Sequence, residues 1–332
     1  MAFSDILGHG RQVEVLKRAM ERNRLHHAYL FVGPDGVGKR TVALSLALAI
    51  HCTQGDHDSC GQCENCHRIR DGNHPDVRVI APEANKREIT IQQMRGLQRL
   101  LEFRSYSGKK KVAIIDPAHQ MNYHAQNSLL KTLEDPPGDA LIILVANSTG
   151  RLLSTVLSRC LRLCFAFLPV GDVAAFLVRQ QGTPQDQATV LAVLTGGSLG
   201  EALACDAGEL LDERNQWIER FSSLSRSDYR GLVSLAEEMA RDRETALRSL
   251  QWVREWYRDI LIQQTTGSAS EMKNSDLVHK IRDAASKQSL NHTLSVLSQM
   301  GGVAGKLQRN YNRRLVLEDF FIRVVAGDPT GL

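Results

Sequence analysis

The chain has no uninterrupted apolar run near the roughly 20 residues that a membrane-spanning helix needs. Its first residues lack a basic stretch followed by an apolar core, so we expect a cytoplasmic protein rather than a secreted one. Aromatic residues make up only 5% of the chain, and the formal net charge is only +4. Such a small excess does not indicate a nucleic-acid binder by bulk charge. The 332 residues contain 42% hydrophobic and 23% charged side chains, which excludes a disordered, collagen-like or coiled-coil rod and allows two or three domains.

Seven cysteines are the unusual feature of the composition. An odd number in a chain without a secretory signal argues against disulfides and favours a metal site or free thiols. Four of them lie close together, in two overlapping C-x-x-C turns and one upstream position: Cys52, Cys60, Cys63 and Cys66. Four thiolates close a tetrahedral Zn²⁺ site with no open position, so we predict structural zinc.

Other interpretations of the cysteine group stay open at this stage. A redox dithiol usually opens a helix after a strand, whereas these cysteines lie in a polar, turn-rich segment. Four ordinary thiols are a further alternative. Three nearby histidines could replace one ligand: His51, His57 and His67.

A glycine-rich loop follows a short apolar strand predicted over 28–32 and precedes an apolar helix over 42–50. Strand, G-x-x-x-x-G-K loop and helix together are typical of a phosphate-binding loop, because glycine N–H groups, a helix N-terminus and Lys39 all favour phosphate. The next position, normally a Ser or Thr on Mg²⁺, is Arg40, and Thr41 comes one residue late. Binding of ATP and Mg²⁺ therefore stays open. The predicted nucleotide-binding residues of the loop are Gly33, Gly36, Gly38, Lys39 and Thr41.

Polar residues also end two further predicted strands. The strand over 111–116 ends in Asp116, as a Walker B strand does. The strand over 140–146 is followed by Asn147, at the end of a strand where ligands meet open α/β sheets. Both residues join the predicted nucleotide site. Pro117, directly after Asp116, has no side chain that could polarise an attacking water.

Local signals predict the helices between these strands. Thr90 and Gln93 form a capping box ahead of an apolar stripe, and a helix over 122–134 stops before two prolines. We expect His119 to be an exposed loop histidine. A basic cluster favours a solvated loop over a DNA contact: Arg104, Lys109, Lys110 and Lys111.

Four segments resemble motifs of the clamp-loader branch of the AAA+ proteins, in the order that the family has them. They are His27–Phe31 leading into the glycine-rich loop, the cysteine knuckle after its helix, the segment Leu129–Pro137, and the S-R-C motif within Leu157–Cys160. Together they span residues 6–167, about half of the chain. The chain is therefore similar to bacterial clamp-loader subunits.

The resemblance implies a three-part architecture. An α/β AAA+ P-loop domain over 1–167 would carry the zinc module at about 52–66, a small helical lid would cover 168–207, and an all-α collar would cover 208–332. The residues themselves indicate only amphipathic helices in the last part, one of them over 244–264.

Three positions at which this chain departs from the family pattern indicate which member of the family it resembles. The ATP-hydrolysing gamma/tau subunit has a Ser or Thr at the place of Arg40, a glutamate at the place of Pro117 and a sensor arginine at the place of Gly200. The chain is thus most similar to a member that does not hydrolyse ATP. The S-R-C motif implies that Arg159 is an arginine finger acting on a neighbour's ATP, whereas the plain alternative is a helix-surface arginine. Asn147 matches the sensor-1 position.

The resemblance also implies partners. The chain would be a stator that assembles with gamma/tau and delta into a hetero-pentamer, which loads a sliding clamp onto primed DNA for a DNA-directed DNA polymerase, with no ATPase activity of its own. One alternative is an active gamma/tau-like ATPase that uses Lys39, Thr41 and Asp116. Another is an AAA+ remodeller unrelated to replication.

Overall fold

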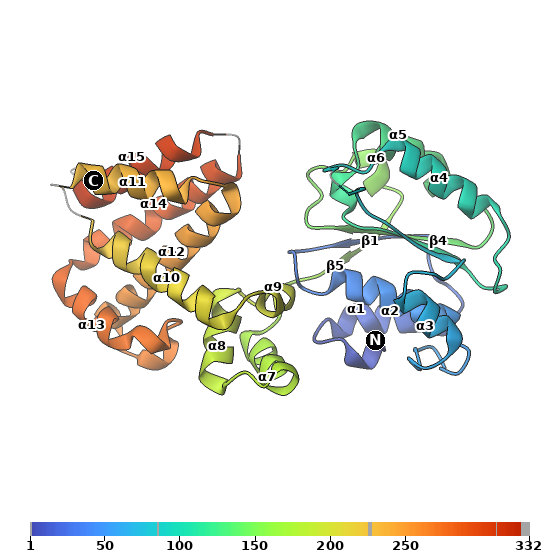
Figure 1. The fold of residues 1–332 in the computed structure, drawn as a ribbon, viewed down its shortest axis with the longest axis horizontal. Helices are drawn as coiled ribbons and strands as arrows, with labels where there is room; N and C mark the ends of the chain where they lie inside the picture. Colours follow the sequence, from blue (N-terminus) through green and yellow to red (C-terminus); the bar gives the residue numbers. More distant parts are fainter. Residues whose placement is uncertain (1, 85, 225–227, 310, 327–332) are drawn as a thin grey trace. The chain divides into compact units, whose positions relative to one another are not determined.

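The computed structural model describes residues 2–84, 86–224, 228–309 and 311–326. The chain divides into two compact units, each described by itself below (Figure 1). Unit 1 comprises Met1–Val173 with Thr195–Leu203, and unit 2 comprises Ala174–Leu194 with Ala204–Leu332. The boundaries at 167 and 207 stay predictions, and the end of the predicted collar, 327–332, lies outside the described residues.

Unit 1 is built on a parallel five-stranded sheet with the order β2-β3-β4-β1-β5. The strands are β1 (Ala28–Val32), β2 (Val77–Ile80), β3 (Lys111–Ile115), β4 (Ala140–Ala146) and β5 (Leu161–Cys164). The predicted α/β class is thereby confirmed, and β1 and β4 have the bounds that their apolar runs predicted. The strand predicted over 111–116 ends one residue early, so Asp116 is the first residue beyond β3.

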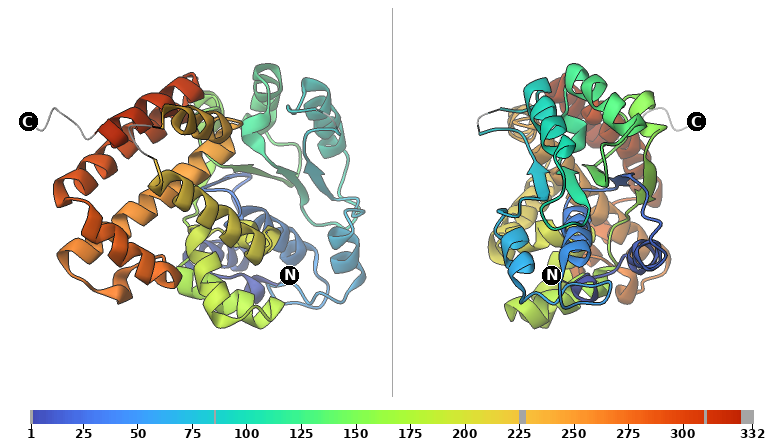
Figure 2. Two further views of the ribbon diagram at one scale, coloured as in Figure 1. Left: turned by 60° about the vertical axis from the view of Figure 1, so that its left-hand side comes forward. Right: turned by 90° about the vertical axis from the view of Figure 1, so that its right-hand side faces the viewer.

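Helices cover both faces of this sheet (Figures 1 and 2). One layer contains α1 (Gly10–Glu21), α2 (Lys39–His51) and α3 (Glu64–Arg70), and the other contains α4 (Ile91–Glu102), α5 (Tyr123–Glu134) and α6 (Ser154–Leu157). Along β1, Tyr29 and Phe31 pack into the α1–α3 core, whereas Leu30 and Val32 pack into the α4–α6 core. Burial on both faces explains why β1 and β4 read as continuous apolar runs.

Side-chain caps begin two of the helices of the second layer, α4 and α5, as the sequence predicts. The Thr90 backbone N–H donates to Gln93 Oε1 at 3.0 Å, which is one half of the capping box before α4. Asn122 Oδ1 accepts from the Ala125 N–H at 2.9 Å and caps α5. Each cap satisfies a backbone donor that the first helical turn leaves free.

Unit 2 is helical in its described residues, as expected. Its helices are α7 (Val170–Gln181, whose first turn belongs to unit 1), α8 (Gln185–Leu194), α10 (Ala207–Ser222), α11 (Tyr229–Met239), α12 (Arg243–Thr265), α13 (Val278–Lys287), α14 (Leu290–Gln308) and α15 (Arg313–Ala326). The long helix α12 packs on α10, α13 and α14 through residues such as Trp252 and Ile260. No helix within the described ranges has both the length and the apolar character to cross a membrane.

A buried polar network holds the segment 272–276 against α10 and α12. Arg214, 0% exposed, donates to both carboxylate oxygens of Asp276 and to Asn274 Oδ1. Asp259, also 0% exposed, accepts from the backbone N–H groups of Lys273 and Asn274 at 3.0 and 2.8 Å. Because both buried charges are satisfied by several hydrogen bonds, the network fixes this corner of unit 2 without an unpaired ion.

Candidate functional site

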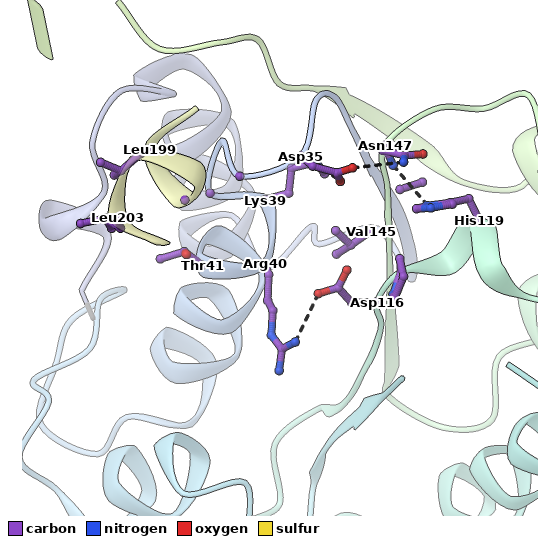
Figure 3. Close-up of a pocket in the computed structure, with 15 residues that line it drawn as sticks. Asp35, Lys39, Arg40, Thr41, Asp116, His119, Val145, Asn147, Leu199 and Leu203 are labelled. Atoms are coloured by element: carbon purple, nitrogen blue, oxygen red, sulfur yellow. Dashed lines mark hydrogen bonds and ion pairs between the residues drawn. The ribbon is translucent and has the colours of Figure 1, made fainter. Parts of the chain in front are cut away.

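A pocket of about 340 Å³ lies in unit 1 at the edge where β1, β3 and β4 end (Figure 3). In a parallel sheet all carboxyl ends meet at one edge, so loops that are distant in sequence converge there. Most of the predicted nucleotide-binding residues line this pocket: Gly36, Gly38, Lys39, Thr41, Asp116 and Asn147. Gly33 is the predicted residue that the pocket lining does not include.

The three glycines of the loop have different physical roles. Gly36 and Gly38 have φ values of +72° and +102°, a backbone conformation that favours glycine. A Cβ at Gly33 would lie 2.2 Å from the backbone oxygen of Phe165, so this glycine permits close packing of the loop on the chain after β5. The sequence pattern did not distinguish a packing glycine from the two that shape the turn.

Lys39 turns back onto the glycine-rich loop. Its residue is 5% exposed, and Nζ donates to the Gly33 carbonyl at 2.7 Å and to the Pro34 carbonyl. The Asp35 carboxylate lies 3.8 Å from Nζ. Burial lowers the pKa of Lys39, and the charges of Asp35 and Asp116 oppose that shift. The ammonium group is therefore held by the loop's own oxygens.

Arg40 places a positive charge beside the Asp116 carboxylate. Its Nη1 lies 3.6 Å from Asp116 Oδ2, and the Asp116 side chain is 16% exposed (Figure 3). Burial raises the pKa of the Asp116 carboxyl, while Arg40 and Lys39 act in the opposite direction. In P-loop ATPases a Ser or Thr hydroxyl and the Walker B aspartate share Mg²⁺. Here Arg40 stands at the place of that Ser or Thr, and its guanidinium pairs with the carboxylate of Asp116.

The carboxylates lining the pocket are Asp35 and Asp116, and both have partners. Asn147 Nδ2 donates to Asp35 Oδ2 at 3.2 Å, which links the end of β4 to the glycine-rich loop. Pro117 stands beside Asp116 in the lining and brings no polar side chain. Among the described residues of the lining, no glutamate therefore follows Asp116.

His119 departs from its expected position. It lies in the 3-10 turn η2 (Ala118–Gln120), half-buried in the pocket lining, and its Nδ1 accepts from the Asn147 N–H at 3.4 Å. Burial lowers its pKa, so the ring is neutral at pH 7. The expectation of an exposed loop histidine was wrong, because the turn after β3 folds back over the end of β4.

The chain around Gly200 is clamped onto the glycine-rich loop. The Gly200 N–H donates to the Gly36 carbonyl at 2.7 Å, and Ser198 Oγ donates to the Asp35 carbonyl at 3.1 Å. A Cβ at Gly200 would lie 2.8 Å from Gly36 Cα. At the place of the family's sensor arginine, the helix α9 (Leu199–Ala204) thus leaves no room for any side chain.

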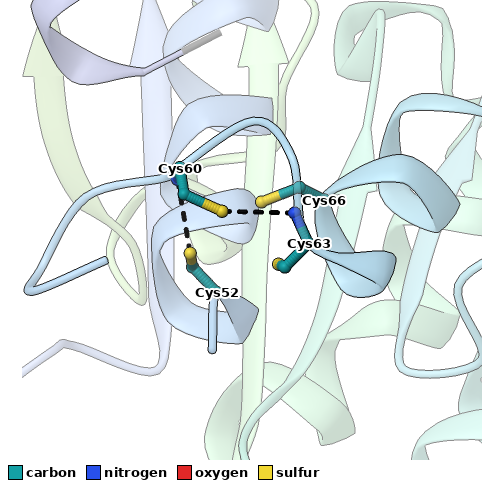
Figure 4. Close-up of side chains that lie close together, drawn as sticks. All are labelled: Cys52, Cys60, Cys63 and Cys66. Carbon is teal, nitrogen blue, oxygen red and sulfur yellow. Dashed lines mark hydrogen bonds between the residues drawn. The ribbon is translucent and has the colours of Figure 1, made fainter. Parts of the chain in front are cut away.

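The four predicted metal ligands lie together beside α2 and α3, as Figure 4 shows. The sulfur atoms of Cys52, Cys60, Cys63 and Cys66 are all within 4.8 Å of one another. Backbone N–H groups of Gly55 and Cys60 donate to Cys52 Sγ at 3.1 and 3.3 Å. The group of four cysteines could hold a metal ion.

The acidities of these thiols also suit a cation. Burial opposes ionisation, but backbone N–H donors hold the pKa of Cys52 below its ordinary value and lower that of Cys63 to about 6. Burial, together with the hydrogen bond that the Cys66 thiol donates to the Cys63 sulfur, raises the pKa of Cys66 to about 12. A bound dication would offset the cost of ionising a buried thiol such as Cys66, because it stabilises every thiolate that binds it.

A second buried group lies next to the cysteines, formed by His51, His74 and Asp76. The oxygens of Asp76 accept four hydrogen bonds from the turn 105–107, and these donors lower its pKa to about 2 despite its burial. His51 Nδ1 lies 3.2 Å from Ser107 Oγ. Because protein donors already saturate the carboxylate, this group is a hydrogen-bonded anchor for the turn. The sequence analysis did not find it, since its members come from two separate segments, the end of α2 and residues 74–76.

Arg159 lies outside the pocket of its own chain, one residue beyond the C-cap of α6. Its side chain is 33% exposed. The guanidinium donates to the Thr155 carbonyl at 2.9 Å and pairs with Glu134, whose side chain is 53% exposed. The group is therefore a partly exposed surface cation, held by an ion pair with Glu134 and by hydrogen bonds to Thr155 and Ser158.

The chain has a parallel α/β unit with a P-loop motif, in which Asp116 is paired with an arginine, and a helical unit. It is therefore of the class of P-loop α/β proteins with a helical C-terminal part. Family models agree with this division: one described as DNA polymerase III, delta subunit, matches residues 8–169, and one described as DNA polymerase III, delta subunit, C terminal, matches residues 208–325.

Relatives of known identity match over nearly the whole chain. The DNA polymerase III subunit delta' of Bacillus subtilis (strain 168) is 30% identical over 96% of this chain and 96% of its own length. The subunit delta' of Escherichia coli (strain K12) is 28% identical over 94% of this chain and 92% of its own. DNA polymerase III subunit tau/gamma of Haemophilus influenzae is 34% identical, but over 61% of this chain and 30% of its own length. The chain belongs to the delta' subunit family of DNA polymerase III.

The close contact between Gly200 and the glycine-rich loop predicts that a side chain at position 200 destabilises the fold. Gly200→Ala forces a methyl group against the backbone of Gly36, so we expect a loss of about 1–3 kcal/mol, as for other overpacked sites. Thermal unfolding of the full chain measures it. Gly150→Ala is the matched control, because a Cβ there meets no atom within 4 Å. Equal melting temperatures for the two variants would contradict the contact.

Proposed function

We propose that the chain is a clamp-loader subunit that does not hydrolyse ATP and that supplies Arg159 in trans to the ATP site of a neighbouring subunit. The lack of ATP hydrolysis is proposed from the Arg40–Asp116 ion pair at 3.6 Å. The role of Arg159 in trans is supported by family membership and by the S-R-C motif. The chain would act in the cytoplasm as a stator, the subunit against which the others move.

Three separate losses argue against hydrolysis. Arg40 takes the carboxylate that would help to hold Mg²⁺, Pro117 replaces a water-polarising glutamate, and Gly200 leaves no space for a sensor arginine. Each lost group stabilises charge or orients water in phosphoryl transfer, where catalysis is mainly positioning and electrostatics. Restoring one of them would leave the other two absent.

The surroundings of Arg159 suit a role across a subunit interface. A guanidinium forms paired hydrogen bonds with phosphate as readily as with carboxylate. Its present partner, Glu134, is half-exposed, so the pair is weak and a γ-phosphate of an adjacent subunit can replace it at little cost. Helices α5 and α6 supply a fixed base for the side chain.

The same proposal assigns partners and a structural metal. The chain would assemble with gamma/tau and delta into a pentamer that places a sliding clamp on primed DNA. Zn²⁺ would be bound by the four cysteines, whose N–H···S bonds and all-sulfur donor set fit it. Its role would be to hold together the segment 52–66, which has little apolar core of its own.

The purified chain alone is expected to show no ATP turnover in the presence of Mg²⁺. The physical reason is the paired Asp116 carboxylate and the missing glutamate. A steady-state phosphate-release assay measures this, with Lys39→Ala as the blank for contaminating ATPase. Turnover that Lys39→Ala abolishes would show an active gamma/tau-like ATPase and overturn the proposal.

Arg159→Ala is expected to leave assembly with the partner subunits intact and to lower the clamp-stimulated ATPase of the complex by about 10- to 1000-fold. One cation that stabilises the transition state is worth about this much. Size-exclusion chromatography checks assembly, and the ATPase rate checks the finger. Arg162→Ala, an exposed arginine of β5, is the matched control. An unchanged ATPase rate would contradict the trans role.

Metal analysis of the full chain is expected to find about one zinc ion per molecule, as one four-thiolate site requires. Cys66→Ser should lose the metal and lower the melting temperature, because Cys66 is a fully buried residue of α3. Cys164→Ser, at an exposed thiol outside the group, should retain it. A stable wild-type chain without metal would contradict this assignment.

A further inference from the structure

The charge of the chain is concentrated in one short segment. Residues 95–111 contain six cations and one carboxylate, a formal charge of +5, whereas the whole chain carries only +4. The remaining residues therefore sum to −1. The six cations are Arg95, Arg99, Arg104, Lys109, Lys110 and Lys111. They lie on the last turns of α4, in the loop after it and at the start of β3.

The loop over residues 103–111, here called the basic loop, also exposes two aromatic rings. Tyr106 is 79% exposed and Phe103 is 69% exposed, the two most exposed large hydrophobic side chains among the described residues. Folding does not bury them, although each could contribute substantial apolar area. Two exposed rings among cations form a surface that suits a charged ligand with flat apolar faces.

Buried contacts hold the basic loop in one conformation. Asp76 accepts four hydrogen bonds from the turn 105–107, and Lys109 Nζ donates to the Cys52 carbonyl at 2.9 Å. The loop is thereby fixed to the strand β2 on one side and to the cysteine group on the other. A loop that is already ordered loses less conformational entropy when it binds a ligand.

Most of the cationic charge in the basic loop is left unbalanced. Lys109 and Lys111 bond to neutral backbone carbonyls, and Lys111 Nζ also lies 5.8 Å from the centre of the Phe103 ring. Lys110 faces one exposed carboxylate, Asp139, at 3.5 Å. A recess of about 340 Å³ beside the loop is lined by Phe103, Arg104 and two of the lysines, together with the carboxylates of Glu102 and Asp139.

We propose that the basic loop binds single-stranded DNA. The cations would neutralise backbone phosphates, and the rings of Phe103 and Tyr106 would stack on unpaired bases, the combination that sequence-independent single-strand binding uses. Duplex DNA fits less well, because its bases are already stacked on one another. This binding site is independent of the P-loop pocket and goes beyond the function proposed above.

Fluorescence anisotropy of a labelled oligothymidylate of about 20 nucleotides, titrated with the full-length chain, tests the proposal. Between about 50 and about 200 mM salt, binding should weaken steeply. Arg104→Ala/Lys110→Ala should reduce the slope of log K against log salt by about 1.4, since each lost phosphate contact contributes about 0.7. Tyr106→Ala should weaken binding about tenfold at every salt concentration, with the slope unchanged, because it removes stacking.

Matched variants outside the basic loop are the controls. Arg11→Ala/Arg230→Ala removes two exposed arginines, and Tyr229→Ala removes a ring that is 63% exposed; both should bind like the wild type. The proposal is wrong if the loop variants behave like these controls, or if Tyr106→Ala leaves affinity unchanged. It is equally wrong if the chain binds no oligonucleotide while the loop variants impair assembly with partner subunits, since the loop is then a protein interface.

Discussion

The parallel sheet of unit 1 imposes the constraint on which the rest of the site depends. All five strands run in one direction, so β1, β3 and β4 deliver their carboxyl-terminal loops to the same edge. The glycine-rich loop, Asp116 and Asn147 meet there for that reason. Residues that are far apart in the chain therefore line a single pocket.

Two arginines of unit 1 show how placement decides the role of a side chain. Arg40 is 57% exposed, and its carboxylate partner Asp116 is 16% exposed. Arg159 is 33% exposed and pairs with a carboxylate that is half-exposed on the surface. In the proposed function, Arg40 would stand where a metal ion binds in active ATPases, and Arg159 would exchange its carboxylate for a phosphate of a neighbouring subunit.

The cysteine group and the basic loop form a second centre, apart from the pocket. Lys109 bonds to the carbonyl of Cys52, and Ser107 contacts both His51 and Asp76. A metal that holds the cysteines would consequently also hold the base of the loop. Through this connection the cysteine group would help to fix the conformation of the basic loop, in addition to holding together the segment 52–66.

The sequence by itself determined the elements that local patterns encode. Apolar runs placed β1 and β4, the pair Thr90 and Gln93 placed the start of α4, and the spacing of the cysteines placed a four-sulfur group. Only the tertiary structure decided that Arg40 reaches Asp116, that Gly200 touches Gly36 and that His119 is half-buried. Propensities, caps and periodicity act over a few residues, whereas these contacts join segments that become neighbours only when the strands align. The net charge of +4 hides the cluster of cations at 95–111, which the sequence already contains. Only the tertiary structure decided that Phe103 and Tyr106 stay exposed among these cations, because burial depends on contacts between distant segments.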